Sequence, residues 1–238
     1  YQIDGSTDNQ YELLKQLELK HSDFRELKKY CDYKGITFLS TPDEEISLNF
    51  LVDELGMTTV KIGSGELTNP KFLMAVSKMP VDVILSTGMA NLGNIQFALE
   101  VLEKPGTLKS ITILQCTTAY PCPDHEVHLA SMNMIKSSFG YPVGFSDHST
   151  GITASVCAVA LGATVIEKHF TYDRNAKGPD HQASLSPKEL LKYVNEVRKV
   201  DILMGSMRKT VRDVELPNIN VVQKKLFVRK AVSKGTKI

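Results

Sequence analysis

The chain has 238 residues, of which 42% are hydrophobic, and this length can bury one sizeable core or two small ones. Its 28 basic and 27 acidic residues are mixed along the chain and give a formal net charge of +1, so we expect neither a nucleic acid nor a membrane surface as a partner. No apolar run approaches the roughly 18–20 residues of a membrane span, and the four cysteines lack zinc-type spacing, which indicates a reduced, cytoplasmic protein.

Short apolar or β-branched runs alternate with helix-like stretches from residue 22 onward. Strands are expected at residues 36–39, 58–62, 81–85, 111–115, 142–145 and 164–167. Helices are expected near residues 22–34, 44–55, 70–78, 92–103, 129–138, 150–161 and 187–204, with Ser22 and Ser186 as N-caps. Apolar runs without period-2 alternation, separated by helices, predict parallel βαβ units whose strands are buried on both faces.

Polar residues follow nearly every predicted strand. The clusters are Ser40-Thr41-Pro42, Gly63-Ser64-Gly65-Glu66, Ser86-Thr87-Gly88-Met89, the run 116–121, Ser146-Asp147-His148 and Lys168-His169. A doubly wound sheet concentrates such residues at one switch point, whereas a closed barrel uses the loops after all of its strands. The sequence therefore predicts an α/β fold of the (β/α)8 TIM barrel type. Because six units are two short of eight, we expect the first two βα units to precede Tyr1. The barrel domain is assigned to residues 1–210, and residues 211–238 to an exit segment toward a further domain.

Two histidines, His148 and His169, each close a predicted strand. The segment between them reads as one helix, so the two strands should be parallel neighbours and the imidazoles should lie at the same end of the sheet. Together they can bind one metal ion with open positions, such as Mn²⁺, Fe²⁺, Zn²⁺ or loosely held Mg²⁺. The alternative is that each is a hydrogen-bonded structural histidine.

Lys61 lies at the end of a predicted buried strand, where a lysine must leave the core or meet an anion. The Gly-Ser-Gly that follows lets backbone N–H groups approach a phosphate or carboxylate, although the same residues also make an ordinary turn. Glu66 in this loop is a candidate acid/base or sugar-hydroxyl ligand.

The hydroxyl residues that follow strands offer contacts to phosphate or to a polar substrate. They are Ser40-Thr41, Ser86-Thr87 and Thr117-Thr118. Capping of the next helix is the alternative role. The pair Asp180-His181 could orient a substrate or lie on the surface. No serine-hydrolase elbow, Walker loop or dinucleotide-binding glycine motif is present in the sequence.

Ordered blocks along the whole chain carry a resemblance to one enzyme family. They are 10–14, 38–42, 61–69, 85–89, 120–121, 144–151, 167–171 and 178–181, including Lys-Ile-Gly-Ser-Gly-Glu-Leu-Thr-Asn, Gly-Phe-Ser-Asp-His-Ser-Thr-Gly and Gly-Pro-Asp-His. The chain resembles the sialic acid synthase family. That resemblance implies a barrel that condenses phosphoenolpyruvate with an N-acetylated amino-sugar aldehyde, N-acetylmannosamine or a di-acetamido relative. The product is a nine-carbon 2-keto sugar acid, and phosphate is released.

The resemblance also implies roles for individual residues. His148 and His169 look like ligands of a divalent metal, Mn²⁺ before Mg²⁺ or Co²⁺. The phosphoenolpyruvate contacts look like Lys61, Thr41, Ser64 and Ser146, with Thr118 a weaker one, and the contacts to the sugar or the reacting groups look like Glu66, Tyr120 and Asp180. Lys61 and Glu66 are taken as the catalytic residues. A homodimer is implied for the full-length protein, because family members often continue into an antifreeze-like domain that reaches the partner's site.

The chain departs from the usual pattern of the family in two places, and three other functions are alternatives to the synthase. The family normally begins with two further βα units that carry an acidic residue and a lysine of the site, and Ser40-Thr41-Pro42-Asp43 is one residue shorter than the usual pattern. The alternatives are a related barrel synthase for a phosphorylated sugar, a metal-dependent pyruvate aldolase, and a non-catalytic sugar-binding barrel. The motifs favour the sialic and legionaminic branches over the pseudaminic one.

Overall fold

The computed structural model describes residues 15, 17–104, 106–176, 180–181 and 184–237. The chain divides into two compact units, one that reaches Leu203 and one that begins at Met204. The second unit contains the 3₁₀ turn Asp213–Glu215 and helix α9, Leu216–Val222. All of the site residues proposed from the sequence belong to the first unit.

The first unit is built on a five-stranded parallel sheet whose strands follow one another in chain order. The strands are β1 Thr59–Ile62, β2 Asp82–Ser86, β3 Ser110–Cys116, β4 Val143–Asp147 and β5 Ile166–Lys168. Each pair of neighbours is connected through a helix, which is the βαβ arrangement that the alternating pattern predicts. The parallel α/β character of the fold is therefore confirmed.

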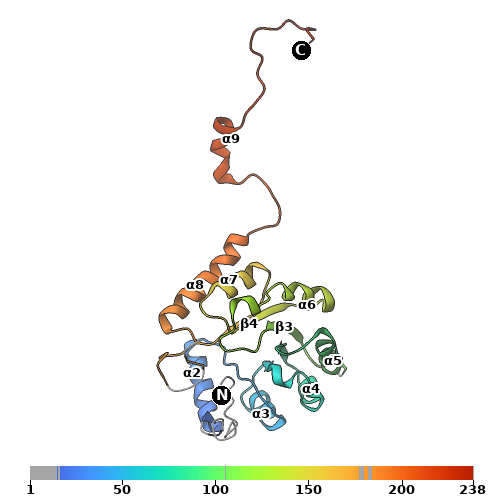
Figure 1. Ribbon diagram of the computed structural model, residues 1–238, viewed down its shortest axis with the longest axis vertical. Helices are drawn as coiled ribbons and strands as arrows, with labels where there is room; N and C mark the ends of the chain where they lie inside the picture. Colours follow the sequence, from blue (N-terminus) through green and yellow to red (C-terminus); the bar gives the residue numbers. More distant parts are fainter. Residues whose placement is uncertain (1–14, 16, 105, 177–179, 182–183, 238) are drawn as a thin grey trace. The chain divides into compact units, whose positions relative to one another are not determined.

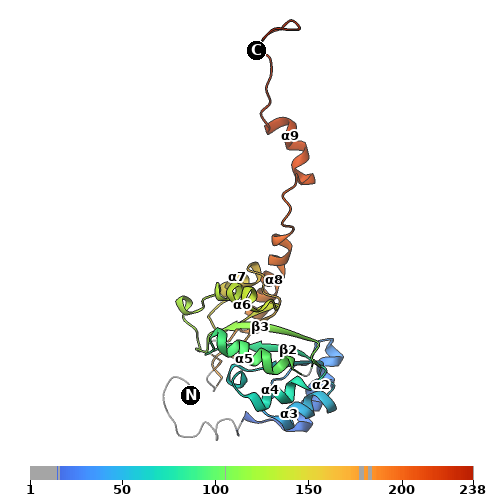
Figure 2. The same cartoon turned by 90° about the vertical axis from the view of Figure 1, so that its right-hand side faces the viewer.

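Helices follow one another around the outside of this sheet, as Figures 1 and 2 show for α4 to α7. Their bounds are α2 His21–Lys34, α3 Glu45–Asn49 with a π-helical continuation Phe50–Glu54, α4 Pro70–Ser77, α5 Leu92–Glu103, α6 Ser131–Phe139, α7 Thr153–Ala160 and α8 Pro187–Met204. The 3₁₀ turns Ser64–Glu66 and Asp124–Glu126 follow β1 and β3. Ser186 precedes α8 as predicted, and its hydroxyl donates to Glu189 Oε2 at 2.6 Å.

Two local predictions are wrong. Residues 36–39 form no strand, since within the described residues β1 pairs only with β2 and offers them no hydrogen-bonded neighbour. Ser22 is not an N-cap, because α2 begins one residue earlier, at His21. The carboxylate of Asp23 accepts the backbone N–H of Lys20 at 3.0 Å and satisfies the helix start in place of a serine hydroxyl.

The two faces of the sheet have different chemistry. Apart from Asp147 and Lys168 at the ends of β4 and β5, the face toward the helices is apolar, and its side chains join those of the helices in one buried cluster: Val60, Ile62, Val83, Leu85, Ile111, Ile113, Val143 and Phe145 from the strands, with Leu73, Leu99, Met132 and Ala158 among the helix residues. The opposite face carries Lys61, Ser146 and Glu167, and Glu167 contacts both of the others. Since successive strand residues point to opposite faces, each polar residue is flanked by residues that face the helices.

The sheet is strongly curved, as an ion pair between its two edge strands shows. Lys61 Nζ on β1 lies 3.3 Å from Glu167 Oε1 on β5. In a flat sheet, four inter-strand spacings of about 4.8 Å would separate these strands by roughly 19 Å, farther than the two side chains reach. The five strands therefore form a half-barrel with the polar face inside. The complete eight-stranded barrel stays a prediction.

Gly144 on β4 allows a close approach between the strands. A Cβ at this position would lie 2.4 Å from the backbone oxygen of Val165 and 2.5 Å from Leu114 Cδ2. Because the Val165 oxygen cannot move without disturbing the pairing of β5, we expect Gly144→Ala to lower the free energy of unfolding by about 1–3 kcal/mol. Urea denaturation of the full-length protein measures this. Gly65→Ala, whose Cβ would meet nothing within 4 Å, is the control, and equal midpoints for the two variants would contradict the close approach.

None of the helices in the described ranges is long and apolar enough to cross a membrane.

Candidate active site

The candidate site lies on the inner face of the sheet, where β4 and β5 end. Two residue pairs are in direct register across these strands, Ser146 with Glu167 and Asp147 with Lys168. His148 and His169 follow immediately, with their ring centroids 5.6 Å apart. Because side chains alternate between faces, the Ser146–Glu167 pair and the two histidines lie on the inner side. The close approach of the two imidazoles agrees with the arrangement that their spacing predicts.

Glu167 connects three strands at this point. One carboxylate oxygen faces Lys61 Nζ on β1, and the other accepts the hydroxyl of Ser146 on β4 at 2.7 Å. The lysine predicted to meet an anion therefore has a carboxylate beside it, with 15% of the lysine side chain exposed. No role for Glu167 is predicted from the sequence. The signal that could have found it is its position two residues before His169, which puts both on one face of a strand.

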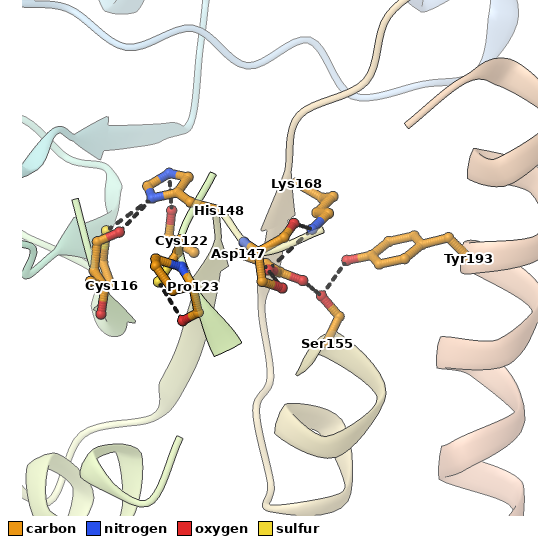
Figure 3. A network of polar contacts seen from close by, with 11 residues as sticks. Cys116, Cys122, Pro123, Asp147, His148, Ser155, Lys168 and Tyr193 are labelled. Atoms are coloured by element: carbon orange, nitrogen blue, oxygen red, sulfur yellow. Dashed lines mark hydrogen bonds and ion pairs between the residues drawn. The ribbon is translucent and has the colours of Figure 1, made fainter. Parts of the chain in front are cut away.

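His148 is oriented by the backbone. Its Nδ1 lies 2.8 Å from the carbonyl oxygen of Thr117, so Nδ1 carries the proton and donates, and Nε2 keeps its lone pair. Nε2 lies 3.5 Å from Ser146 Oγ, and Sγ of Cys116 lies 3.9 Å from Nδ1 (Figure 3). Burial lowers the pKa of His148, which favours the neutral ring.

Burial also lowers the pKa of His169, against the opposing effect of the Asp180 carboxylate. Both imidazoles are thus neutral near pH 7, the form that ligates a metal. Two imidazoles on one ion, with metal–nitrogen distances of about 2 Å, have ring centres roughly 4.5–6 Å apart, which the observed separation matches. The part of the chain that the structure describes holds no group of three His, Cys, Asp or Glu side chains suited to a metal. The pair accordingly fits an ion that keeps positions open for other ligands.

Tyr120 packs against both histidines. Its ring centroid lies 4.1 Å from that of His148 and 5.7 Å from that of His169. An aromatic ring in this position restricts the orientations available to both imidazoles. It comes from the loop after β3, so three successive strand ends converge here.

A group of polar side chains surrounds Gly88 after β2. Its backbone N–H donates to Ser64 Oγ at 2.9 Å, and a Cβ on this glycine would lie 2.1 Å from Thr118 Oγ1, so no other residue fits without displacing them. The hydroxyl oxygens of Thr118 and Ser86 are buried and have no hydrogen-bond partner among the described residues. Such groups usually have a partner, which a bound water or a polar ligand would supply. Thr87, in contrast, uses its hydroxyl on the carbonyl oxygen of Leu114 at 2.7 Å.

Glu66 and Thr41 lie at the β1 side of the site. Glu66 Oε2 accepts Asn69 Nδ2 at 2.6 Å, and a Cβ on Gly63 would lie 3.9 Å from Thr41 Cγ2. Partial desolvation and the Glu66 carboxylate raise the pKa of Asp43, while Lys61 opposes them. Asp43 is therefore a further acidic residue of this region. The sequence alone does not identify Asp43, because the segment Ser40-Thr41-Pro42 before it predicts a role only for its hydroxyls.

Asp180 lies near His169, whose pKa its carboxylate affects. The preceding Gly178 and Pro179 of the same motif lie outside the described residues. His181 Nδ1 is 2.7 Å from Thr171 Oγ1, so this histidine has a structural hydrogen bond of its own.

The amino-acid sequence is similar to those of known enzymes. The NeuB family model matches residues 1–209. An N,N'-diacetyllegionaminic acid synthase from Campylobacter jejuni is 46% identical over 97% of the chain and 69% of its own length. The human N-acetylneuraminate-9-phosphate synthase is 34% identical over 93% of the chain and 61% of its own length. The chain thus spans roughly two thirds of the length of such relatives.

A solved structure shares the fold as well. The N-acetylneuraminic acid (sialic acid) synthetase of Leptospira borgpetersenii, solved with citrate, superposes with a TM-score of 0.83 at 32% identity, over 93% of this chain and 78% of that one.

Proposed function

The chain belongs to the NeuB family, and on that premise we propose that its inner-face site condenses phosphoenolpyruvate with an N-acetylated amino-sugar aldehyde. Water is consumed, and the products are a nine-carbon 2-keto sugar acid and inorganic phosphate. The observation that carries the proposal is that Lys61, whose charge acts on His148, lies on the strand next to that of Ser86, whose buried hydroxyl has no partner among the described residues. That combination offers an anion site and a metal site in one curved sheet.

Phosphoenolpyruvate would bind at the anion site. Lys61 supplies a positive charge, and the hydroxyls of Ser86 and Thr118 supply donors whose hydrogen bonds the protein itself does not satisfy. Thr41, Ser64 and Ser146 are proposed as further contacts, because Thr41 lies close to the loop after β1, Ser64 accepts the N–H of Gly88, and Ser146 donates to the partner of Lys61. Binding at this site would orient phosphoenolpyruvate with its C3 toward the histidines. It would also reduce the entropic cost of bringing the two reactants together.

His148 and His169 would hold a divalent ion, with Mn²⁺ proposed first and Mg²⁺ or Co²⁺ as substitutes. When bound, such an ion supplies Lewis-acid polarisation of a carbonyl oxygen. The chain's own groups orient the acceptor: Tyr120 packs against the histidines, and Asp180 lies near His169. Glu66 is proposed to move a proton at a sugar hydroxyl or at the water that adds to C2. In the reaction C3 of phosphoenolpyruvate forms a bond to the aldehyde carbon of the sugar, and water adds at C2. The bond between C2 and the bridging oxygen then breaks, and this oxygen leaves as part of the inorganic phosphate.

The acceptor is proposed to be a di-acetamido sugar of the legionaminic type. Support comes from the two relatives named N,N'-diacetyllegionaminic acid synthase, which are 46% and 39% identical, against 34% for the human N-acetylneuraminate-9-phosphate synthase. N-Acetylmannosamine is the alternative acceptor. We further propose that the full-length protein completes a (β/α)8 barrel, forms a homodimer and works in the cytoplasm. The assignment of residues 1–210 and 211–238 to barrel and exit segment belongs to the same proposal.

A phosphate-release assay on the full-length protein with Mn²⁺ tests this function. We expect release with phosphoenolpyruvate and a di-acetamido sugar and a lower rate with N-acetylmannosamine, and we expect no keto-acid product, followed by mass spectrometry, when pyruvate replaces phosphoenolpyruvate. His148→Ala should lose the metal-dependent rate, and exposed His125→Ala is its control. Condensation with pyruvate would support the aldolase instead, and sugar binding without turnover would support the non-catalytic barrel.

A further inference from the structure

A second polar network lies on the opposite face of β4 and β5 from the histidines, and we call Asp147, Ser149, Ser155, Lys168 and Tyr193 the Asp147 network. Asp147 Oδ1 accepts the N–H of Ser149 at 2.9 Å and its hydroxyl at 2.6 Å, and Oδ2 accepts Ser155 Oγ at 2.5 Å. Lys168 Nζ lies 3.1 Å from the same carboxylate and also donates to the carbonyl oxygen of Ser149. Figure 3 shows His148 pointing to the other side of β4.

The charged pair of this network is almost completely buried. The Asp147 side chain is 0% exposed and the Lys168 side chain 3%, so each charge depends on the other and on the surrounding donors. Burial raises the pKa of Tyr193 to about 12, so its hydroxyl stays protonated and donates to Ser155 Oγ at 3.0 Å. The network therefore connects β4 and β5 through α7 to α8.

The residues of the Asp147 network adjoin the two histidines in the sequence. Asp147 and Lys168 each directly precede one of the histidines, and Ser149 directly follows His148. A single buried carboxylate thus fixes the backbone on both sides of His148 and, through Lys168, the residue before His169. Asp147 therefore holds together the two backbone segments that carry the imidazoles.

We infer that the Asp147 network is a positioning device, which sets the distance between His148 and His169 and so tunes the affinity for the metal ion. The inference rests on the proposed function, because it concerns the ion assigned there. Groups behind metal ligands typically change metal affinity by about 10- to 100-fold when they are replaced. A buried ion pair that served folding alone would be replaceable by apolar residues without such an effect.

Mn²⁺ titration of the full-length protein, followed by the electron paramagnetic resonance signal of free Mn²⁺, tests this inference. The main variant is the double change Asp147→Asn with Lys168→Met, which leaves no unpaired buried charge and should fold. We expect its Kd for Mn²⁺ to rise about 10-fold or more. Tyr193→Phe, which removes only the hydroxyl that donates to Ser155, should raise Kd by less than the double change does. Tyr33→Phe, an exposed tyrosine on α2, is the matched control and should leave Kd unchanged.

The outcomes separate the two proposals. A wild-type protein that binds no Mn²⁺ would contradict the metal assignment of the proposed function. Binding by wild type with the same Kd in the double variant and in Tyr193→Phe would overturn the positioning role and leave the proposed function intact. Weakened binding in a double variant that melts at the wild-type temperature supports positioning, since a purely structural role would have been rescued.

Discussion

Replacing Lys61 by methionine should lower kcat/KM for phosphoenolpyruvate by about 10²–10³-fold in the full-length protein. The lysine is proposed to provide the positive charge of the anion site, and methionine keeps its apolar stem but no charge. Its removal also leaves Glu167 without its partner at 3.3 Å, so an anionic donor would meet an uncompensated carboxylate. Initial rates of phosphate release against phosphoenolpyruvate concentration measure the effect.

Two further variants separate the roles of this lysine. Lys78→Met, at the exposed end of α4, removes a charge outside the site and should keep the wild-type rate. The double change Lys61→Met with Glu167→Gln removes both charges of the pair. We expect it to stay as inactive as Lys61→Met, because the donor still lacks its cation. Recovery of the rate would mean that Lys61 serves only to neutralise Glu167.

The thermal stability of Lys61→Met should change little, since the Glu167 carboxylate stays 37% exposed and keeps the hydrogen bond from Ser146. Loss of activity with an unchanged melting temperature therefore distinguishes a role in the site from a role in folding.

Replacing Lys168 by methionine should have the largest effect on stability, a loss of about 3–5 kcal/mol. The Asp147 carboxylate would remain buried with its neutralising charge removed, and hydrogen bonds from Ser149 and Ser155 alone would not compensate. For a unit of about 200 residues, this corresponds to a fall in melting temperature of roughly 6–20 °C. Calorimetry or circular dichroism measures it.

A double-mutant cycle gives this prediction its control. Asp147→Asn combined with Lys168→Met should regain most of the lost stability, because no unpaired charge remains buried. If the two single effects simply added in the double variant, Asp147 and Lys168 would not be energetically coupled, and the buried ion pair would be contradicted.

The strands and their ends were predictable because apolar runs and Gly-, Ser- or His-rich ends are local signals. Five of the six predicted strands exist, within two residues of their predicted bounds. The absence of a strand at residues 36–39 was not predictable. A strand requires a hydrogen-bonded neighbour, and the sequence pattern does not show whether one is present. The same holds for curvature: nothing in the run around Lys61 indicates that it meets Glu167 across the sheet.

The histidine pair followed from spacing, because one helix between two strands brings their ends together. The Asp147 network did not, although every one of its residues is visible in the sequence. Asp147 and Lys168 read as ordinary neighbours of site residues until their burial and their hydrogen bonds to α7 and through it to α8 are known. Buried polar contacts of this kind depend on packing between elements that are distant along the chain.

The central claim is that the inner face of this sheet joins phosphoenolpyruvate to an amino-sugar aldehyde. Mass spectrometry of the products formed by full-length protein, Mn²⁺, phosphoenolpyruvate and a di-acetamido sugar tests it most directly, with phosphate measured in the same sample. We predict one nine-carbon 2-keto acid for each phosphate released, and neither product from His148→Ala. Phosphate released without the acid, or the acid formed equally well by His148→Ala, would contradict the account.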